Sequence, residues 1–123
     1  MTNKEFVCQF IETIFNRKEL TKLDEYMDKN YLHHDTDAAQ GKAGFIDFIG
    51  HFFMLYPYVK LNIKHAYQEN DIVVLHIHAV CEPGKTESNN FEVFRIENGL
   101  ISEHWCSIQK LTDKQISNSS SIF

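Results

Sequence analysis

The 123-residue sequence lacks several features that would assign it to a class of protein at once. No apolar stretch approaches the roughly 20 residues that a membrane-spanning helix needs, so no membrane partner is expected. The first ten residues contain no basic segment followed by an apolar run, so a secretory signal is not expected. Acidic residues outnumber basic ones by 17 to 12, and no basic stripe is available to contact phosphates. That balance argues against a nucleic-acid partner.

Cysteine is scarce, and its spacing excludes a zinc-ribbon pattern. Cys8, Cys81 and Cys106 make an odd number, and none of them belongs to a CxxC pair. This usage fits thiols in a reducing compartment, and we therefore expect a cytoplasmic protein.

Aromatic residues are plentiful by comparison. Ten Phe and five Tyr in so short a chain suit a core that leaves a pocket lined by rings. No repeat or linker divides the sequence. We expect one domain over residues 1–112 and a flexible segment over residues 113–123.

Apolar periodicity predicts helices in the first half of the chain and strands in the second. Spacing of three and four residues predicts helices over 3–19, 20–27 and 42–56, with a turn-rich stretch at 30–42. Alternation predicts strands over 59–67, 71–82, 90–97 and 100–111. Helices followed by an antiparallel meander predict an α+β domain.

The segment IVVLHIHAV, residues 72–80, raises a question about two histidines. His76 and His78 point to the same side of the strand, together with Ile72, Val74 and Val80. A fully buried face would not be interrupted by two imidazoles that each need partners. We therefore expect at least one of them, His78 above all, to line a partly wet cavity. An HxH metal site is the alternative, with a further ligand from His34, Glu92 or His104.

A carboxylate and a hairpin mark the last two strands. Glu92 shares a strand face with Phe94 and Ile96, so burial is expected to raise its pKa. Asn98-Gly99 is a hairpin signal. A two-residue turn sets Glu92 opposite Trp105 and makes Trp105 a pocket wall, whereas a bulge at Gly99 would set His104 there.

Three segments resemble the SnoaL-like polyketide cyclases of the nuclear-transport-factor-2-like superfamily, which includes ketosteroid isomerase. They are NYLHHD…QGKAGFIDFI, DIVVLHIHAV and FEVFRIENGLISEHWCSIQ, and the likeness extends over residues 5–110. The resemblance implies a cystatin-like cone, with N-terminal helices packed on a curved antiparallel sheet of four to six strands. It also implies an apolar pocket, no metal and no cofactor.

The resemblance also transfers site residues. The loop histidine of the group falls on His34, its acidic strand residue on Glu92, and its EHW triplet on residues 103–105. Many relatives carry Asp directly after that Trp, where this chain has Cys106. A mechanism that relies on a carboxylate at this point is not transferred.

Two functions fit these features. The first is proton transfer next to a carbonyl, as in an isomerase or aldol-type cyclase acting on a small hydrophobic carbonyl compound. The residues expected to be catalytic are His34, His78 and Glu92, and those expected to bind the ligand are His76, Trp105, His104 and Asp35. The second is a binding module that holds a hydrophobic ligand without turnover.

A homodimer is expected on separate grounds. Strand residues 72–80 are apolar on both faces, and about 120 residues supply too little helix to cover both sides of a sheet. A second copy packed on the uncovered face would remove it from water.

Overall fold

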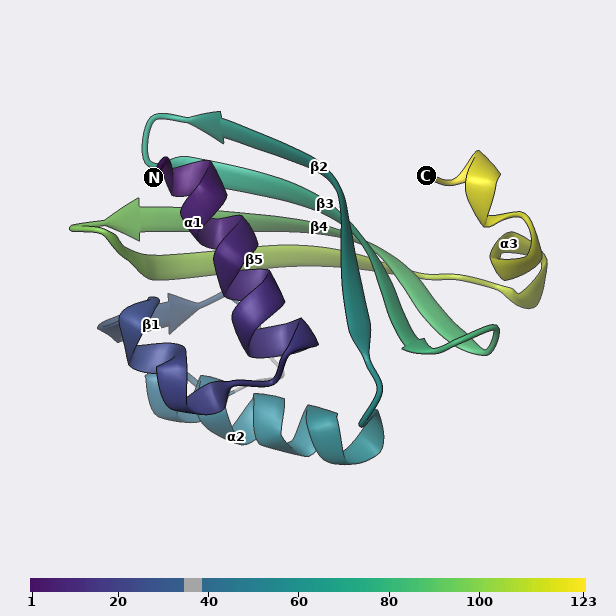
Figure 1. Ribbon diagram of the computed structural model, residues 1–123, viewed down its shortest axis with the longest axis horizontal. Coiled ribbons are helices and arrows are strands. Elements are labelled where there is room, and N and C mark those ends of the chain that lie inside the picture. The colour runs from purple at the N-terminus through teal and green to yellow at the C-terminus, as the bar shows by residue number, and fades with distance from the viewer. Residues whose placement is uncertain (35–38) are drawn as a thin grey trace.

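The computed structural model of the chain describes residues 1–34 and 39–123. Over these residues, five strands form one curved sheet in the order β1-β5-β4-β3-β2, and helices pack against it (Figure 1). In chain order the elements are α1 (Asn3–Phe10), a π-helix (Ile11–Asn16), a 3₁₀ helix (Leu20–Glu25), β1 (Met27–His33), α2 (Gly41–Leu55), β2 (Lys60–Glu69), β3 (Ile72–Glu82), β4 (Thr86–Glu97), β5 (Leu100–Lys110), α3 (Asp113–Ser117) and a 3₁₀ turn (Ser119–Ser121). The predicted α+β class and strand number are confirmed.

The N-terminal helix begins at a capping box. Thr2 Oγ1 accepts a hydrogen bond from the Glu5 backbone N–H at 3.1 Å, and Glu5 Oε1 accepts one from the Thr2 backbone N–H at 3.0 Å. The helix lies across one face of the sheet (Figure 1). Together with the π-helix that continues it, α1 buries the predicted stripe, including Val7, Phe10 and Ile14, each at most 2% exposed. The single predicted helix over residues 3–19 is therefore α1 followed by the π-helix.

Strand β1 was not predicted. The sequence favours a helix up to Met27 and a polar turn from residue 30, but β1 pairs in parallel with β5. Lys29, Asn30 and Leu32 are exposed, whereas Met27, Tyr31 and His33 are buried. The sheet is thus antiparallel except at this edge, and the parallel pairing brings His33 beside His104.

The β4–β5 hairpin has the predicted turn but not the predicted register. Asn98 and Gly99 both have positive φ, and Ile96 pairs with Ile101 as expected. Ser102 then has no opposite residue in the β4–β5 ladder, because the next pair is Arg95 with Glu103. This bulge sets Glu92 opposite Cys106, rather than opposite Trp105 or His104.

The two faces of the sheet differ in what covers them. We call the face toward α1 and α2 the inner face and the opposite one the outer face. Val73, Leu75 and Ile77 are fully buried in the core on the inner face. His76 and His78 alternate with them and therefore lie on the outer face. The prediction that at least one of these histidines lines the cavity is wrong, because the uninterrupted apolar face packs on the helices.

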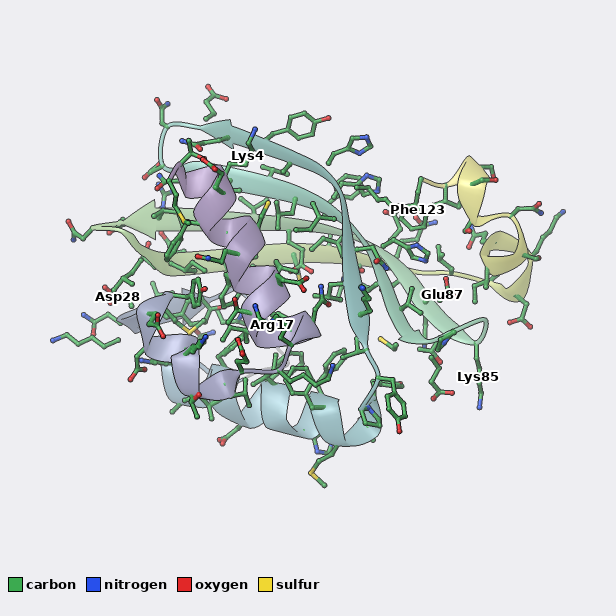
Figure 2. The ribbon with its side chains drawn as sticks, viewed as in Figure 1. Lys4, Arg17, Asp28, Lys85, Glu87 and Phe123 are labelled. Carbon is green, nitrogen blue, oxygen red and sulfur yellow. The ribbon has the colours of Figure 1, made fainter. Side chains whose placement is uncertain are left out.

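Residues 113–123 form α3 and a 3₁₀ turn beside the far end of the sheet (Figure 1). Phe123 reaches the outer face and stacks on His78, with ring centroids 4.2 Å apart. Figure 2 shows Phe123 and Glu87 at the same end of the molecule. The flexibility of this segment stays a prediction.

Among the described residues, no helix combines the length and apolar character needed to cross a membrane.

Candidate functional site

A cavity of about 310 Å³ lies between the inner face and α2. Apolar and aromatic side chains make up much of its lining, and Phe48, Phe52 and Tyr56 form one wall. Strands β4 and β5 supply the polar wall, which includes Asn90, Glu92, His104 and Cys106, and β1 adds His33. A concave apolar site with a few convergent polar groups is the usual form of a small-molecule site.

Glu92 and His104 form the central pair of this polar wall. Glu92 Oε1 accepts a hydrogen bond from His104 Nε2 at 2.7 Å, and the two side chains are 13% and 11% exposed. Asn90 Nδ2 donates to Glu92 Oε2 at 3.3 Å. The bulge at Ser102 makes the pair possible, because it turns His104 to the side on which Glu92 lies.

The ionisation of Glu92 differs from the sequence-based expectation. Burial by itself raises the pKa of this carboxyl, as predicted. The hydrogen bond from His104 and its charge, with help from Asn90 and His33, outweigh burial and lower the pKa of Glu92 below its ordinary value. The carboxylate is therefore ionised at neutral pH, and the expectation of a raised pKa is wrong.

A chain of hydrogen bonds leads from this pair into the core. His104 Nδ1 lies 3.4 Å from His33 Nδ1, which in turn lies 2.6 Å from the Tyr31 hydroxyl. A hydrogen bond between two ring nitrogens needs a proton on one of them. Burial, followed by the charge of Glu92, raises the pKa of Tyr31, which keeps its hydroxyl protonated.

Sequence reasoning missed His33 and Tyr31. The resemblance transferred the loop histidine to His34, but His33 is the residue that lines the cavity. The signal was the two-residue spacing of Tyr31 and His33, which the polar neighbours obscured. Reading that stretch as a strand would have placed His33 and Tyr31 on one face.

His34 and Trp105 lie on the outer face. Their rings stack with centroids 4.6 Å apart, and His34 Nε2 lies 2.8 Å from Glu103 Oε2. Neither residue lines the cavity. Trp105 as a pocket wall is therefore wrong, and His34 stands outside the cavity to which the sequence assigned it. The predicted ligand residue Asp35 lies outside the described residues.

The paired strand histidines also have outer-face partners. His78 Nε2 lies 2.7 Å from Glu87 Oε1, and His76 Nε2 lies 2.7 Å from Asn89 Oδ1. His76 stacks between His65 and Phe91, with centroid distances of 5.2 and 4.6 Å. These contacts answer the question raised by residues 72–80, because neighbouring side chains satisfy the imidazoles; Glu87, the partner of His78, lines the cavity, but neither histidine does.

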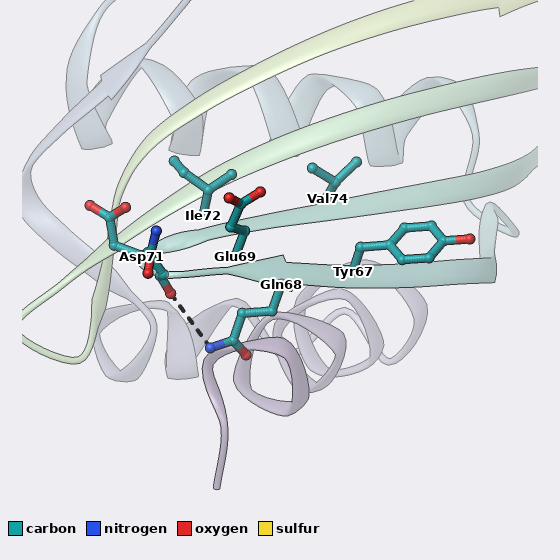
Figure 3. Close-up of a pocket in the computed structure, with 7 residues that line it drawn as sticks. Tyr67, Gln68, Glu69, Asp71, Ile72 and Val74 are labelled. Atoms are coloured by element: carbon teal, nitrogen blue, oxygen red, sulfur yellow. Dashed lines mark hydrogen bonds between the residues drawn. The ribbon is translucent and has the colours of Figure 1, made fainter.

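A second hollow, of about 370 Å³, follows the β2–β3 hairpin (Figure 3). Its lining is continuous in sequence, from Tyr67 to Ile72 with Val74 added. Of its two acidic residues, Glu69 and Asp71, the second is already paired with Arg95 at 2.7 Å. The inner cavity, which gathers buried titratable groups from β1, β4 and β5, is the better candidate site.

One group in the described part of the chain has the donor set for a metal ion. Ligand atoms of Glu92, His104 and Cys106 all lie within 4.8 Å of one another. This is not the HxH site considered from the sequence, since His76 and His78 do not belong to it.

Comparison with solved structures defines the class of fold. A SnoaL-like polyketide cyclase from Agrobacterium tumefaciens has a TM-score of 0.77 at 12% identity, covering 100% of this chain and 99% of that one. TsrD from Streptomyces laurentii has a TM-score of 0.72 at 19% identity, covering 89% and 92%. A nuclear-transport-factor-2-like protein of unknown function from Cytophaga hutchinsonii has a TM-score of 0.73 at 14% identity, covering 89% and 91%. The fold is the cone of this superfamily.

Comparison with protein families defines the family. The model of the SnoaL-like polyketide cyclases matches residues 5–115, and the chain belongs to this family. No curated protein matches the sequence.

Proposed function

We propose that this protein catalyses proton transfer at a carbon next to a carbonyl group, as an isomerase or aldol-type cyclase does. The observation that supports the proposal best is the hydrogen-bonded pair of Glu92 and His104, which lines an otherwise apolar cavity. Such chemistry needs a base, a donor for the developing enolate oxygen, and a site that limits access of water.

Glu92 is the proposed base. Its lowered pKa keeps the carboxylate ionised, which is the form that can accept a proton from carbon. His104, at 2.7 Å, orients the carboxylate and provides a route for the proton. The weaker hydrogen bond from Asn90 at 3.3 Å holds the other oxygen.

His33 is the proposed donor to the enolate oxygen. It lines the cavity, and its Nδ1 atom lies 2.6 Å from the buried Tyr31 hydroxyl. A positioned donor stabilises negative charge most where water is scarce, as among the phenylalanine rings of α2. His34 and His78 take no part in this proposal, because both lie outside the cavity.

The test is exchange of hydrogen with solvent. A bicyclic aryl ketone with α-hydrogens is incubated in D₂O with the protein, and deuterium uptake is followed by NMR. Glu92→Gln should reduce the catalysed rate by roughly 100-fold or more. Glu103→Gln is the matched control, since it removes a histidine-bonded carboxylate from the outer face, and its rate should stay within about two-fold. Equal rates in wild type and Glu92→Gln would refute the proposal.

A binding module remains the second candidate, because Cys106 stands where the family resemblance implies an Asp. The cavity would then retain a hydrophobic carbonyl compound, with His33 and His104 bonding its polar end. Mass spectrometry of small molecules that copurify with the protein distinguishes the two candidates. A retained ligand combined with no deuterium exchange would favour binding without turnover.

We also propose a homodimer joined through the outer face, and a cytoplasmic location. Large apolar side chains remain on that face, with Tyr67 62% and Phe91 48% exposed in the single chain. A two-fold contact would cover both patches at once. The cytoplasmic location is supported by the three cysteines, which carry thiols and form no disulfide among the described residues.

A further inference from the structure

We propose that Glu92, His104 and Cys106 bind one divalent cation of the Zn²⁺ type at the polar wall of the cavity. Their ligand atoms lie within 4.8 Å of one another, on neighbouring strands. Glu92 and Cys106 face each other directly across the β4–β5 ladder, and His104 is two residues before Cys106 on the same face. The inference goes beyond the proposed proton transfer and does not depend on it.

The donor set selects the kind of ion. One carboxylate oxygen, one imidazole nitrogen and one thiolate sulfur suit a borderline-soft cation such as Zn²⁺ or Co²⁺. Magnesium and calcium prefer oxygen ligands alone, so they fit this set poorly. A bound divalent ion would also favour loss of the proton from the Cys106 thiol.

The geometry needs little rearrangement. Tetrahedral coordination, with bonds of about 2.1 Å to nitrogen and oxygen and about 2.3 Å to sulfur, sets ligand atoms about 3.3–3.6 Å apart. The present separations of the three ligand atoms are at most 4.8 Å. Side-chain rotations that move these atoms by roughly 1 Å would bring them to tetrahedral spacing. The cation would take the place of the proton shared by Glu92 Oε1 and His104 Nε2, which are now 2.7 Å apart.

The surroundings resemble those of an open metal site. Three protein ligands leave one tetrahedral position, and all three line the cavity, so that position can face its interior. Asn90 bonds the second oxygen of Glu92, and His33 contacts the ring of His104. Residues that hydrogen-bond to metal ligands in this way orient the ligands and strengthen metal binding.

A divalent ion bound at this site would interfere with the proposed proton transfer. The ion would hold the carboxylate and the imidazole that the proton transfer needs, so Zn²⁺ should suppress deuterium exchange and a chelator should restore it. Binding is measured separately on protein without substrate, so failure of the proposed activity and failure of this site give different results.

The experiment uses untagged protein, freed of metal by a chelator and kept reduced. Titration with Zn²⁺ should give one ion per chain by calorimetry. Co²⁺ should produce the near-ultraviolet charge-transfer band of a thiolate ligand. Cys106→Ser should abolish that band and weaken Zn²⁺ binding at least ten-fold, and His104→Gln should weaken it similarly. Circular dichroism checks that each variant is folded.

Two control variants make the result specific. Cys81→Ser removes another thiol that lines the same cavity but lies outside the cluster, and it should bind as the wild type does. His76→Gln removes the outer-face histidine that lies 2.9 Å from His65, where two imidazoles meet. No stoichiometric binding, a cobalt–thiolate band that persists in Cys106→Ser, or binding lost in His76→Gln and kept in Cys106→Ser would each overturn the proposal.

Discussion

The two faces of the sheet carry the same chemical pair in different surroundings. On the inner face, His104 and Glu92 lie 2.7 Å apart with side chains 11% and 13% exposed. On the outer face, His34 and Glu103 lie 2.8 Å apart with side chains 39% and 22% exposed. Both carboxyls have a lowered pKa, chiefly because a histidine bonds each of them. Distance and ionisation therefore do not distinguish the two pairs.

What distinguishes them is the medium around each pair. Water screens the outer pair, and Arg95 shares Glu103 at 2.8 Å. The inner pair borders an apolar cavity, where an ionised group interacts more strongly with a bound molecule. A pair of this kind indicates a functional site only when a cavity accompanies it.

The largest expected difference between the faces is in packing. Leu75, fully buried on the inner face, should lose roughly 2–5 kcal/mol of unfolding free energy when replaced by Ala. Its outer-face neighbour Val74 is half-buried, and Val74→Ala should cost about 1 kcal/mol or less. Urea denaturation of both variants measures the difference. A loss for Val74→Ala as large as that for Leu75→Ala would mean that the proposed second copy covers this part of the outer face.

The two faces should also differ in their effect on the proposed homodimer. If a second copy covers the outer face, light scattering at micromolar concentration should report about twice the chain mass of 14.4 kDa. Phe91→Glu places a charge on that face and should return the mass to that of one chain. The inner-face variant Glu92→Gln should leave the mass unchanged. A wild-type protein that is monomeric would contradict the proposed dimer.

Acid should affect the inner pair through Glu92. Because the folded-state pKa of Glu92 is lowered, its contribution to stability is present above the ordinary glutamate pKa of about 4.3 and is lost as pH falls through the folded value. The groups that face it are His104, His33, Tyr31 and Cys106. Glu92→Gln should therefore flatten the acid limb of thermal unfolding measured by calorimetry. An unchanged slope would mean that Glu92 has no such coupling.

The smallest effect is expected for the outer pair. Exposed ion pairs contribute about 0–1 kcal/mol, so Glu103→Gln should shift the urea midpoint only slightly. The small shift should shrink further in 1 M salt, because salt screens exposed charges. A large loss that is independent of salt would place Glu103 among the groups that hold the hairpin together.

The fold could be predicted from the sequence because its main signals are local. The stripe of α1, the alternation in β3 and the Asn98-Gly99 turn each depend on neighbouring residues. Strand β1 could not be found in this way, because it forms only against β5, far along the chain. Tertiary pairing there overrides a polar local pattern.

The candidate site was predictable only in part. Glu92 was found because a carboxylate aligned with Phe94 and Ile96 is conspicuous in a strand. His33 was missed with β1, and His78 was assigned to the wrong face because the histidines were assumed to need water or ligand. Glu87 and Phe123 satisfy and cover His78 instead, and neither contact has a local signature in the sequence.

The unpaired Ser102 has a consequence for comparing relatives. The residues of the EHW triplet face alternate sides, so a relative without the extra residue would present Glu and Trp to its cavity and turn His outward. Aligning the triplet letter by letter would then equate side chains on opposite sides of two sheets. Residue roles should therefore be transferred within this family by following strand pairing from the hairpin turn in each three-dimensional structure. A gap of one residue in the sequence alignment is enough to exchange a catalytic candidate for a surface residue.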